Sequence, residues 1–350
     1  MAATAGAAVP KTFYGVVPQT PLAAADYERM GEGRVGTLRF ELYWAGVDPS
    51  AAAGDYNWSA PDAVVANAAS NGIQPLPFVY STPTWVANGI DGFNCGASSC
   101  PPYAPKSRGA LDAWGTFLRD AVRRYGPGGD FWAENPGIPE FPIRNWQLLN
   151  EQNSPTIYKP KPNVKAYAKV LAAAEDAISA EDAGAKVILG GMFQTPLQGR
   201  KPAIEAWNYL EKLYKVKGAK KSFDGVAVHP YAPKMKTVID VVELMRDEMK
   251  DARDKRTGLW ITELGWASGG PEHPLNRGKA GQAQRLREAF RYFKRKRRKF
   301  HVQTVNWYSW RDNPNAGVGL CTWCPDSGLF TQSLAPKPSW DAFTKFTGGN

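Results

Sequence analysis

The feature that most constrains the fold of this chain is a regular alternation of apolar runs with segments of helical periodicity. The apolar runs are bounded by turn residues and predict eight β-strands: Phe13–Pro18, Val35–Trp44, Ile73–Tyr80, Asn145–Asn150, Ala185–Gly190, Gly225–His229, Gly258–Glu263 and Val302–Trp310. The segments between them carry apolar residues at three-to-four spacing and predict helices: Pro61–Ser70, Ala110–Arg124, Val164–Ala180, Ala203–Lys215, Val238–Asp254 and Gly281–Lys296. Strands that alternate with helices predict a parallel sheet.

Eight strands are enough to close a barrel. The chain has 350 residues, and a (β/α)8 barrel commonly takes about 250 residues or more as one domain. The runs Val187–Leu189 and Val226–Val228 contain no polar residue, as expected of strands buried on both faces. A flavodoxin-like or Rossmann sheet is the competing architecture, but no G-x-G-x-x-G turn directly follows the first predicted strand. We therefore expect one α/β domain, a (β/α)8 TIM barrel over residues 12–346, preceded by a flexible stub at residues 1–11.

Two glutamates stand at the ends of predicted strands, where a barrel strand delivers side chains to the face that holds active sites. Glu151 follows the fourth run, in the sequence WQLLNEQN, and Glu263 ends the seventh, in LWITELGW. Cleavage of a glycosidic bond needs two carboxyl groups in one cleft. One protonates the departing oxygen, and the other attacks the anomeric carbon or activates a water. A lone acidic residue after a strand is about as often a turn residue, so the interpretation depends on the pair and its context.

These two segments resemble the Asn-Glu-Pro acid/base signature of strand four and the Thr-Glu nucleophile segment of strand seven in the clan A glycoside hydrolases. The resemblance covers nearly all of residues 12–346 and is greatest for the family-39-like secreted bacterial glycosidases. It implies a retaining O-glycosyl hydrolase that cleaves a β-linked oligosaccharide, polysaccharide or glycoside by double displacement. Glu151 would be the acid/base and Glu263 the nucleophile. Position 152 departs from the pattern, because it is Gln where the clan usually has Pro.

The resemblance also implies four polar side chains around the two glutamates. Arg39, near the end of strand two, corresponds to an arginine that contacts the nucleophile, and Tyr231 to a tyrosine that donates a hydrogen bond to it. His229 would line the sugar subsite, and Asn150 would bond the sugar 2-hydroxyl. An arginine and a tyrosine hydroxyl beside a carboxylate favour its ionised form. Taken singly, Arg39 could instead be a barrel salt-bridge partner and His229 a core histidine.

Tryptophans at strand ends and in loops are candidate platforms for the apolar faces of sugars. The chain has 13 tryptophans, and most are expected to serve packing. Trp44 and Trp266 stand at strand ends, and Trp85 lies in the loop after strand three. The segment at the end of strand eight resembles the one that supplies the aromatic floor of the innermost subsite, and either Trp307 or Trp310 is expected to form that floor.

The four cysteines fall into two close pairs, Cys95 with Cys100 and Cys321 with Cys324, one in each long loop that follows strands three and eight. Two local disulfides are the preferred interpretation, and they imply an oxidising compartment. A four-cysteine zinc site is the rival, since the spacings permit it. Pinning the two longest loops of the catalytic face would hold sugar subsites in register.

The chain carries a formal net charge of +10, from 43 Lys and Arg against 33 Asp and Glu. The densest basic run, Lys294–Lys299, follows the amphipathic stretch Gln284–Phe293 and precedes a predicted strand. We expect it to end a helix, where the C-terminus favours cations. We interpret the run as a solvated helix end and expect no nucleic-acid partner.

Several other classes of protein are not supported by the sequence. No apolar run reaches the roughly 18 residues of a membrane span. His229, His273 and His301 lack metal-ligand spacing, and no G-x-S-x-G elbow occurs. We expect a secreted monomer with a carbohydrate substrate and neither metal nor cofactor; its start is interpreted as the stub of a mature chain. The alternative, suggested by Gln152, is a barrel that binds carbohydrate without catalysis.

Overall fold

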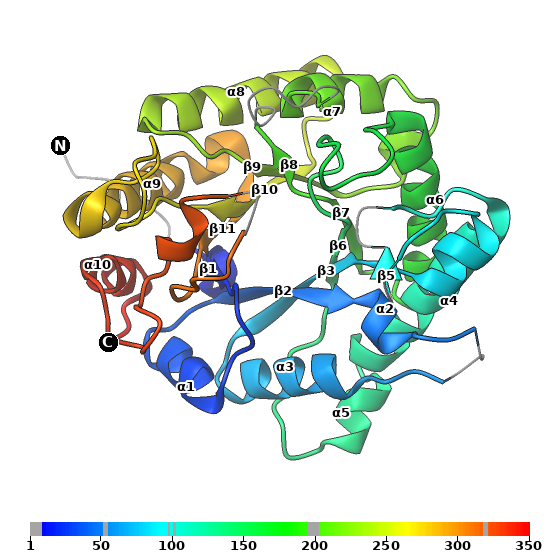
Figure 1. The fold of residues 1–350 in the computed structure, drawn as a ribbon, viewed down its shortest axis with the longest axis horizontal. Helices are drawn as coiled ribbons and strands as arrows, with labels where there is room; N and C mark the ends of the chain where they lie inside the picture. The colour runs from blue at the N-terminus through cyan, green and yellow to red at the C-terminus, as the bar shows by residue number, and fades with distance from the viewer. Residues whose placement is uncertain (1–8, 52–54, 97–98, 101–102, 195–202, 318–320) are drawn as a thin grey trace.

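The computed structural model describes residues 9–51, 55–96, 99–100, 103–194, 203–317 and 321–350, with the side chains of residues 99–100 left out. Parallel strands pair in the order β1–β2–β3–β6–β7–β9–β10–β11, and β11 pairs back with β1 to close a barrel (Figure 1). The barrel strands are β1 (Tyr14–Val17), β2 (Thr37–Tyr43), β3 (Gln74–Tyr80), β6 (Asn145–Leu148), β7 (Lys186–Leu189), β9 (Gly225–His229), β10 (Gly258–Leu264) and β11 (Val302–Tyr308). Each falls within one residue of a predicted run or inside it, so the predicted (β/α)8 barrel is confirmed.

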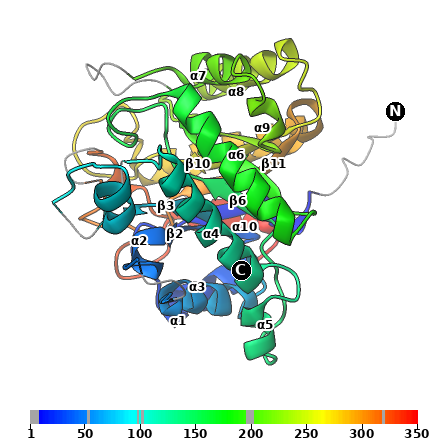
Figure 2. The same ribbon diagram turned by 90° about the vertical axis from the view of Figure 1, so that its right-hand side faces the viewer.

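Helices surround the barrel on its outside (Figures 1 and 2). The six predicted helices are α3 (Ser59–Ser70), α4 (Arg108–Tyr125), α6 (Val164–Glu181), α7 (Ala206–Tyr214), α8 (Met235–Asp251) and α9 (Gly278–Phe300). Four more helices among the described residues were not predicted: α1 (Ala24–Glu32), α2 (Trp44–Val47), α5 (Asp130–Glu134) and α10 (Pro338–Thr347). The remaining elements of the described residues are η1 (Lys11–Phe13), β4 (Thr82–Pro83), η2 (Trp85–Ile90), β5 (Ser99–Cys100), β8 (Met192–Phe193), η3 (Ala219–Lys221) and η4 (Cys324–Asp326).

The inside of the barrel contains a small apolar layer separate from the main core. It consists of Leu76, Ile188, Ala227 and Trp260, which come from β3, β7, β9 and β10. Gly225 makes room for this layer, because a Cβ there would lie 2.4 Å from Ile188 Cδ1 and 2.7 Å from Trp260 Nε1. The main core lies between the strands and the helices. Such layering makes the barrel a packed body whose strand ends are rigid supports for side chains.

The two long loops predicted at the catalytic face are residues 81–107, after β3, and residues 309–337, after β11. Cys321 and Cys324 form a disulfide in the second loop, as predicted. The side chain of Cys100 lies outside the described residues, so the pairing of Cys95 with Cys100 stays a prediction. Peptide mapping of the non-reduced protein should find both pairs, and a free thiol at Cys100 or bound zinc would contradict the pairing.

The basic run ends a helix, as predicted. Arg297, Arg298 and Lys299 occupy the last turn of α9, and His301 caps it in the left-handed conformation at φ 52°. Cations there complement the negative end of the helix dipole. In the described part of the chain, no helix is long and apolar enough to cross a membrane.

Candidate active site

Glu263 lies near the end of β10, and each of its carboxylate oxygens accepts a hydrogen bond. Arg39 Nη1 donates to Oε1 at 2.6 Å, and the hydroxyl of Tyr231 donates to Oε2 at 2.7 Å. Glu263 is 8% exposed and Arg39 is 0% exposed, so this is a buried ion pair. Burial and the charge of Glu263 hold the pKa of Tyr231 well above its usual value, so the hydroxyl remains a donor.

Arg39 joins three barrel strands through its guanidinium. Besides Glu263, it donates from Nε to Gln147 Oε1 at 2.6 Å and from Nη2 to Asn150 Oδ1 at 2.8 Å. The guanidinium also lies 4.1 Å from the ring centroid of Phe78. A planar fork with all three nitrogens engaged fixes the position of the carboxylate it pairs with. The expected contact between Arg39 and the carboxylate of strand seven is present.

Glu151 follows β6 on a backbone of unusual conformation. Leu149 has φ 63° and Glu151 has φ 44°, both in the left-handed region that is sparsely populated by residues other than glycine. The backbone N–H of Glu151 donates to Gly191 O at 3.0 Å. Gln152, which stands where the clan usually has Pro, is buried and donates from Nε2 to Gly190 O at 3.1 Å. The side chain of Gln152 thus ties the turn to the end of β7.

His229 connects the two carboxylates. Its Nδ1 lies 2.9 Å from Glu151 Oε1 and 3.6 Å from Glu263 Oε2, while its Nε2 lies 3.0 Å from Thr262 Oγ1. One atom each of Glu151, His229 and Glu263 fall within 4.8 Å of one another. The three residues at the ends of β6, β9 and β10 therefore meet in one place, as their positions at strand ends implied.

One histidine and two glutamates in contact could also hold a metal ion, and Glu151, His229 and Glu263 form such a group among the described residues. The donor set does not favour that use. Both oxygens of Glu263 already accept hydrogen bonds, one of them from the cationic Arg39. A divalent cation would have to displace these donors and would stand beside an existing positive charge. The geometry fits proton and carboxylate chemistry better than metal ligation.

The aromatic residue that strand eight presents to the site is Tyr308, and the expectation of Trp307 or Trp310 is wrong. Both indoles are 0% exposed. Trp307 Nε1 donates to Ser327 O at 3.2 Å, and Trp310 Nε1 donates to Asp26 Oδ1 at 2.8 Å. Side chains alternate along a strand, so a neighbour of Trp307 faces the other way. That neighbour, Tyr308, lines a cavity together with Glu263.

Trp323, from the loop after β11, packs beside Tyr308. Its ring centroid lies 5.8 Å from that of Tyr308 and 5.0 Å from that of Tyr231. Trp323 stands between Cys321 and Cys324, so the disulfide closes the backbone around this indole. The sequence predicted the disulfide in this loop, but it did not show which residues Trp323 would contact.

Two further tryptophans expected to contact sugar are also in the core. Trp44 is buried, and its ring centroid lies 5.2 Å from that of Trp114. Trp266 is buried, and its Nε1 donates to Ala232 O at 2.8 Å. Neither has the exposed face that stacking on a sugar requires. Trp85 is partly exposed and donates from Nε1 to Asp48 O at 3.1 Å, so its role as a sugar contact stays a prediction.

A cavity of about 690 Å³ opens beside Glu263 at the barrel mouth. This volume is within the usual range of small-molecule sites, roughly 300–1,000 Å³. Arg39, Phe78 and Tyr308 line it around the carboxylate, and two residues that the sequence analysis missed, Glu41 and Tyr43, line it further out. The alternation of β2 outward from Arg39 was the signal that could have found them.

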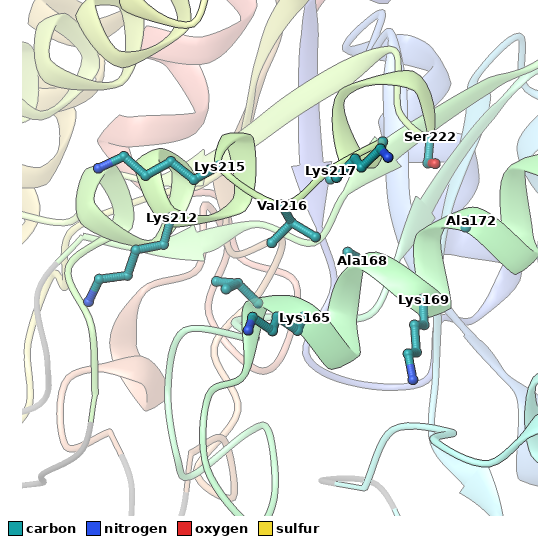
Figure 3. Close-up of a pocket in the computed structure, with 12 residues that line it drawn as sticks. Lys165, Ala168, Lys169, Ala172, Lys212, Lys215, Val216, Lys217 and Ser222 are labelled. Atoms are coloured by element: carbon teal, nitrogen blue, oxygen red, sulfur yellow. The ribbon is translucent and has the colours of Figure 1, made fainter.

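Another cavity, also about 690 Å³, lies outside the barrel between α6 and α7 (Figure 3). Lys165 and Lys169 come from α6 and Lys212 from α7, with Lys215 at the C-cap of α7 and Lys217 just beyond. The lining contains no carboxylate, histidine or cysteine. It therefore holds no pair of carboxyl groups like the one formed by Glu151 and Glu263, and we place the candidate chemistry at the barrel mouth.

Stability should depend on the ionisation of Glu263. Burial raises the pKa of Glu263. The charge of His229, the guanidinium of Arg39 and the Tyr231 hydroxyl together lower it by more than burial raises it, so the pKa lies below its ordinary value. In the unfolded chain the same group titrates near pH 4.3, at about the value of a free glutamate. Between these two values only the unfolded state binds the proton. The stabilisation is complete above the unfolded pKa and is lost as the pH falls through the folded pKa.

We therefore expect the free energy of unfolding of the wild type to fall more steeply below about pH 4.3 than that of Glu263→Gln, which has no proton to bind at this position. Urea denaturation at several pH values between 3 and 7 measures this difference. Parallel curves for the two proteins would contradict the depressed pKa.

Comparison with solved structures gives the same fold. The chain aligns with a family 39 glycoside hydrolase from the gut symbiont Bacteroides cellulosilyticus WH2 at a TM-score of 0.69 and 21% identity, over 97% of this chain and 64% of that one. It aligns with a GH39 β-xylosidase from Caulobacter crescentus at a TM-score of 0.66 and 16% identity, over 99% of this chain and 73% of that one. The alignment with xylanase 10B from Thermotoga maritima has a TM-score of 0.63 and 14% identity, over 97% of this chain and 95% of that one.

The resemblance read from the sequence is thus confirmed for the fold, which is that of the family 39 and other clan A glycoside hydrolases. At these identities the likeness establishes the fold alone. The chain spans 64% of the length of the Bacteroides enzyme, and the activity of that whole enzyme is therefore not assigned to this chain. No family model matches the sequence, and no curated protein matches it.

Proposed function

We propose that this protein is a retaining glycoside hydrolase that cleaves a β-linked sugar by double displacement. The observation that supports it is the meeting of Glu151 and Glu263 from the ends of β6 and β10, with an oxygen of each within 4.8 Å. Retaining enzymes hold their carboxyl groups roughly 5–5.5 Å apart, whereas inverting enzymes leave roughly 6.5–9.5 Å for a water. The short separation favours retention.

The environments of the two carboxyl groups suit different roles. Glu263 is held ionised by Arg39 and the Tyr231 hydroxyl and is the proposed nucleophile, which attacks the anomeric carbon. Glu151 contacts His229 and has the more exposed side chain, 18% against 11% for Glu263. It is the proposed acid, which protonates the departing oxygen, and then the base that activates water to release the sugar.

Asn150 is the proposed contact for the sugar 2-hydroxyl. Its Oδ1 accepts from Arg39, so Nδ2 is the group that can donate to the substrate. A hydrogen bond at this hydroxyl strengthens as positive charge develops on the ring in the transition state. The Cys321–Cys324 disulfide supports secretion, since such bonds persist in oxidising compartments. We propose that the chain acts outside the cell as a monomer.

Replacing Glu151 with alanine should reveal the role of the acid. The variant should lose on the order of 10²–10⁴-fold in kcat/KM, which reports the first step, on substrates with poor leaving groups, because they need a proton in the transition state. It should lose much less on 4-nitrophenyl glycosides, whose leaving group departs unprotonated. Paired rate measurements on 4-nitrophenyl glycosides and oligosaccharides check this. Equal losses on both would contradict the assignment.

The rival function is a carbohydrate-binding barrel without catalysis, which the unusual Gln152 favours. Wild type and Glu263→Gln should be screened against 4-nitrophenyl β-glycosides and plant and bacterial polysaccharides, with binding and cleavage both recorded. Release of reducing ends by the wild type alone supports the enzyme. Saturable binding by both proteins with no bond broken would support the rival.

A further inference from the structure

Strand β2 presents three side chains in succession to the barrel mouth. Arg39, Glu41 and Tyr43 alternate along the strand and therefore share one face. Arg39 is buried beneath, whereas Glu41 is exposed in the mouth and Tyr43 is 40% exposed. In the pairing with β3, Glu41 lies opposite Phe78 and Tyr43 opposite Tyr80. The outer part of the mouth thus combines a carboxylate with several aromatic rings.

The cavity that contains these residues lies on the nucleophile's side of the site. Glu263, Glu41 and Tyr43 line it, and Glu151 does not. The departing group must lie beside the acid that protonates it, and the sugar under attack beside the nucleophile. This inference rests on the proposed function. It places the ring that remains with the enzyme, and any ring attached to it, in the cavity that Glu41 lines.

Glu41 is held in place and lacks a cation of its own. Ser81, a buried residue with φ 69°, donates from Oγ to Glu41 Oε1 at 2.9 Å. Among the described residues Glu41 forms no ion pair, and the nearby Arg39 is engaged by Glu263, Gln147 and Asn150. Desolvation by the walls raises the pKa of Glu41, more than Ser81 and Arg39 lower it. A partly desolvated carboxylate of this kind is stabilised by a ligand that offers hydrogen-bond donors.

We propose that Glu41 and Tyr43 recognise the glycone, and that Glu41 selects neutral or amino sugars over uronic acids. Tyr43 provides an exposed ring on which the apolar face of a sugar can stack. The free oxygen of Glu41 accepts from a hydroxyl or ammonium group of that sugar. A uronate would bring its own negative charge to a mouth that already holds Glu41 and Glu263, and like charges at short range repel.

The test compares 4-nitrophenyl β-glycosides of glucose, 2-amino-2-deoxyglucose and glucuronic acid. The wild type is expected to have a kcat/KM at least about tenfold higher for the first two than for the glucuronide. Glu41→Gln should lower kcat/KM for these two by about ten- to a hundredfold, mainly by raising KM, and should narrow the difference from the glucuronide. Tyr43→Ala should lower kcat/KM for all three glycosides without changing the order of the three values.

Glu134→Gln, an equal charge change on an exposed residue of α5, is the control and should leave all three values unchanged. A wild-type preference for the glucuronide would overturn the proposal, and so would a preference for the other two glycosides that is as large in Glu41→Gln as in the wild type. If no glycoside is hydrolysed, the proposed function fails separately. Calorimetric titration of the same three compounds into wild type and Glu41→Gln must then give the same order of affinity. Equal binding of all three, or no binding, overturns the inference.

Discussion

Replacement of Glu263 with glutamine is expected to lower kcat on the order of 10⁴-fold or more, as removal of an essential nucleophile does in other enzymes that form a covalent intermediate. A neutral amide cannot form the ester bond to the anomeric carbon. The loss should appear in kcat on 4-nitrophenyl glycosides as well as on oligosaccharides, because the missing group is needed whatever the leaving group. This distinguishes Glu263 from Glu151, whose loss depends on the leaving group.

The fold of Glu263→Gln should remain intact. A glutamine oxygen can still accept from Arg39, which donates to Oε1 at 2.6 Å in the wild type. Circular dichroism and a thermal melt of the variant check this, with Glu134→Gln as the control for loss of one negative charge. Turnover above about a hundredth of the wild-type rate in a fully folded Glu263→Gln would show that another group attacks the substrate.

Replacement of Arg39 with methionine is expected to cause the largest loss of stability, about 3–5 kcal/mol in the free energy of unfolding. The change leaves Glu263 buried without its cation and removes the donor from Gln147 Oε1 and Asn150 Oδ1. A buried carboxylate without its partner also becomes easier to protonate, so activity should fall as well. Urea denaturation at pH 7 measures the stability.

The double variant Arg39→Met/Glu263→Gln separates the ion pair from the loss of packing. When Glu263 is replaced by a neutral residue, removing Arg39 no longer leaves a buried charge without a partner. The free energy of unfolding of the double variant should therefore fall by less than the sum of the losses in the two single variants. Additive effects, or a loss below about 1 kcal/mol for Arg39→Met alone, would show that the pair contributes little to the fold.

Much of this fold could be predicted because barrel strands leave a strong signal in sequence. The runs at Val187–Leu189 and Val226–Val228 are apolar throughout, since parallel strands under helices are buried on both faces. The two glutamates could be found for a related reason: a polar residue that ends such a run must lie at the edge of the barrel. Strand order then brings Glu151 and Glu263 together without any information about loops.

The aromatic contacts could not be assigned in the same way. Trp307 and Tyr308 are the last two residues of β11, and Trp310 follows two residues later; each is chemically suited to stack on a sugar. The register of the strand decides which faces the mouth, and a shift by one residue reverses the answer. Trp44 and Trp266 were predicted to contact sugar but are buried. The reason is similar, because a large amphipathic ring at a strand end can pack under a helix as readily as line a cleft.

Gln152 illustrates the remaining limit of sequence reasoning. As a departure from a family pattern, it suggested lost function. In the structure its amide donates to Gly190 O, which holds the turn that carries Glu151 against β7. A proline would supply rigidity through its ring, whereas this chain supplies it through a long-range hydrogen bond. Such a substitution of one restraint for another becomes visible only when the partner strand is placed.

The proposed covalent intermediate can be trapped with a 2-deoxy-2-fluoro glycoside that carries an activated leaving group, using the sugar that the screen identifies. The fluorine slows both steps, and the good leaving group lets the first proceed, so the glycosyl-enzyme accumulates. Mass spectrometry of the intact chain should then show the addition of one glycosyl unit, and peptide mapping should place it on Glu263. A label on any other residue, or hydrolysis that proceeds with inversion at the anomeric carbon and no labelled protein, would contradict the double-displacement mechanism.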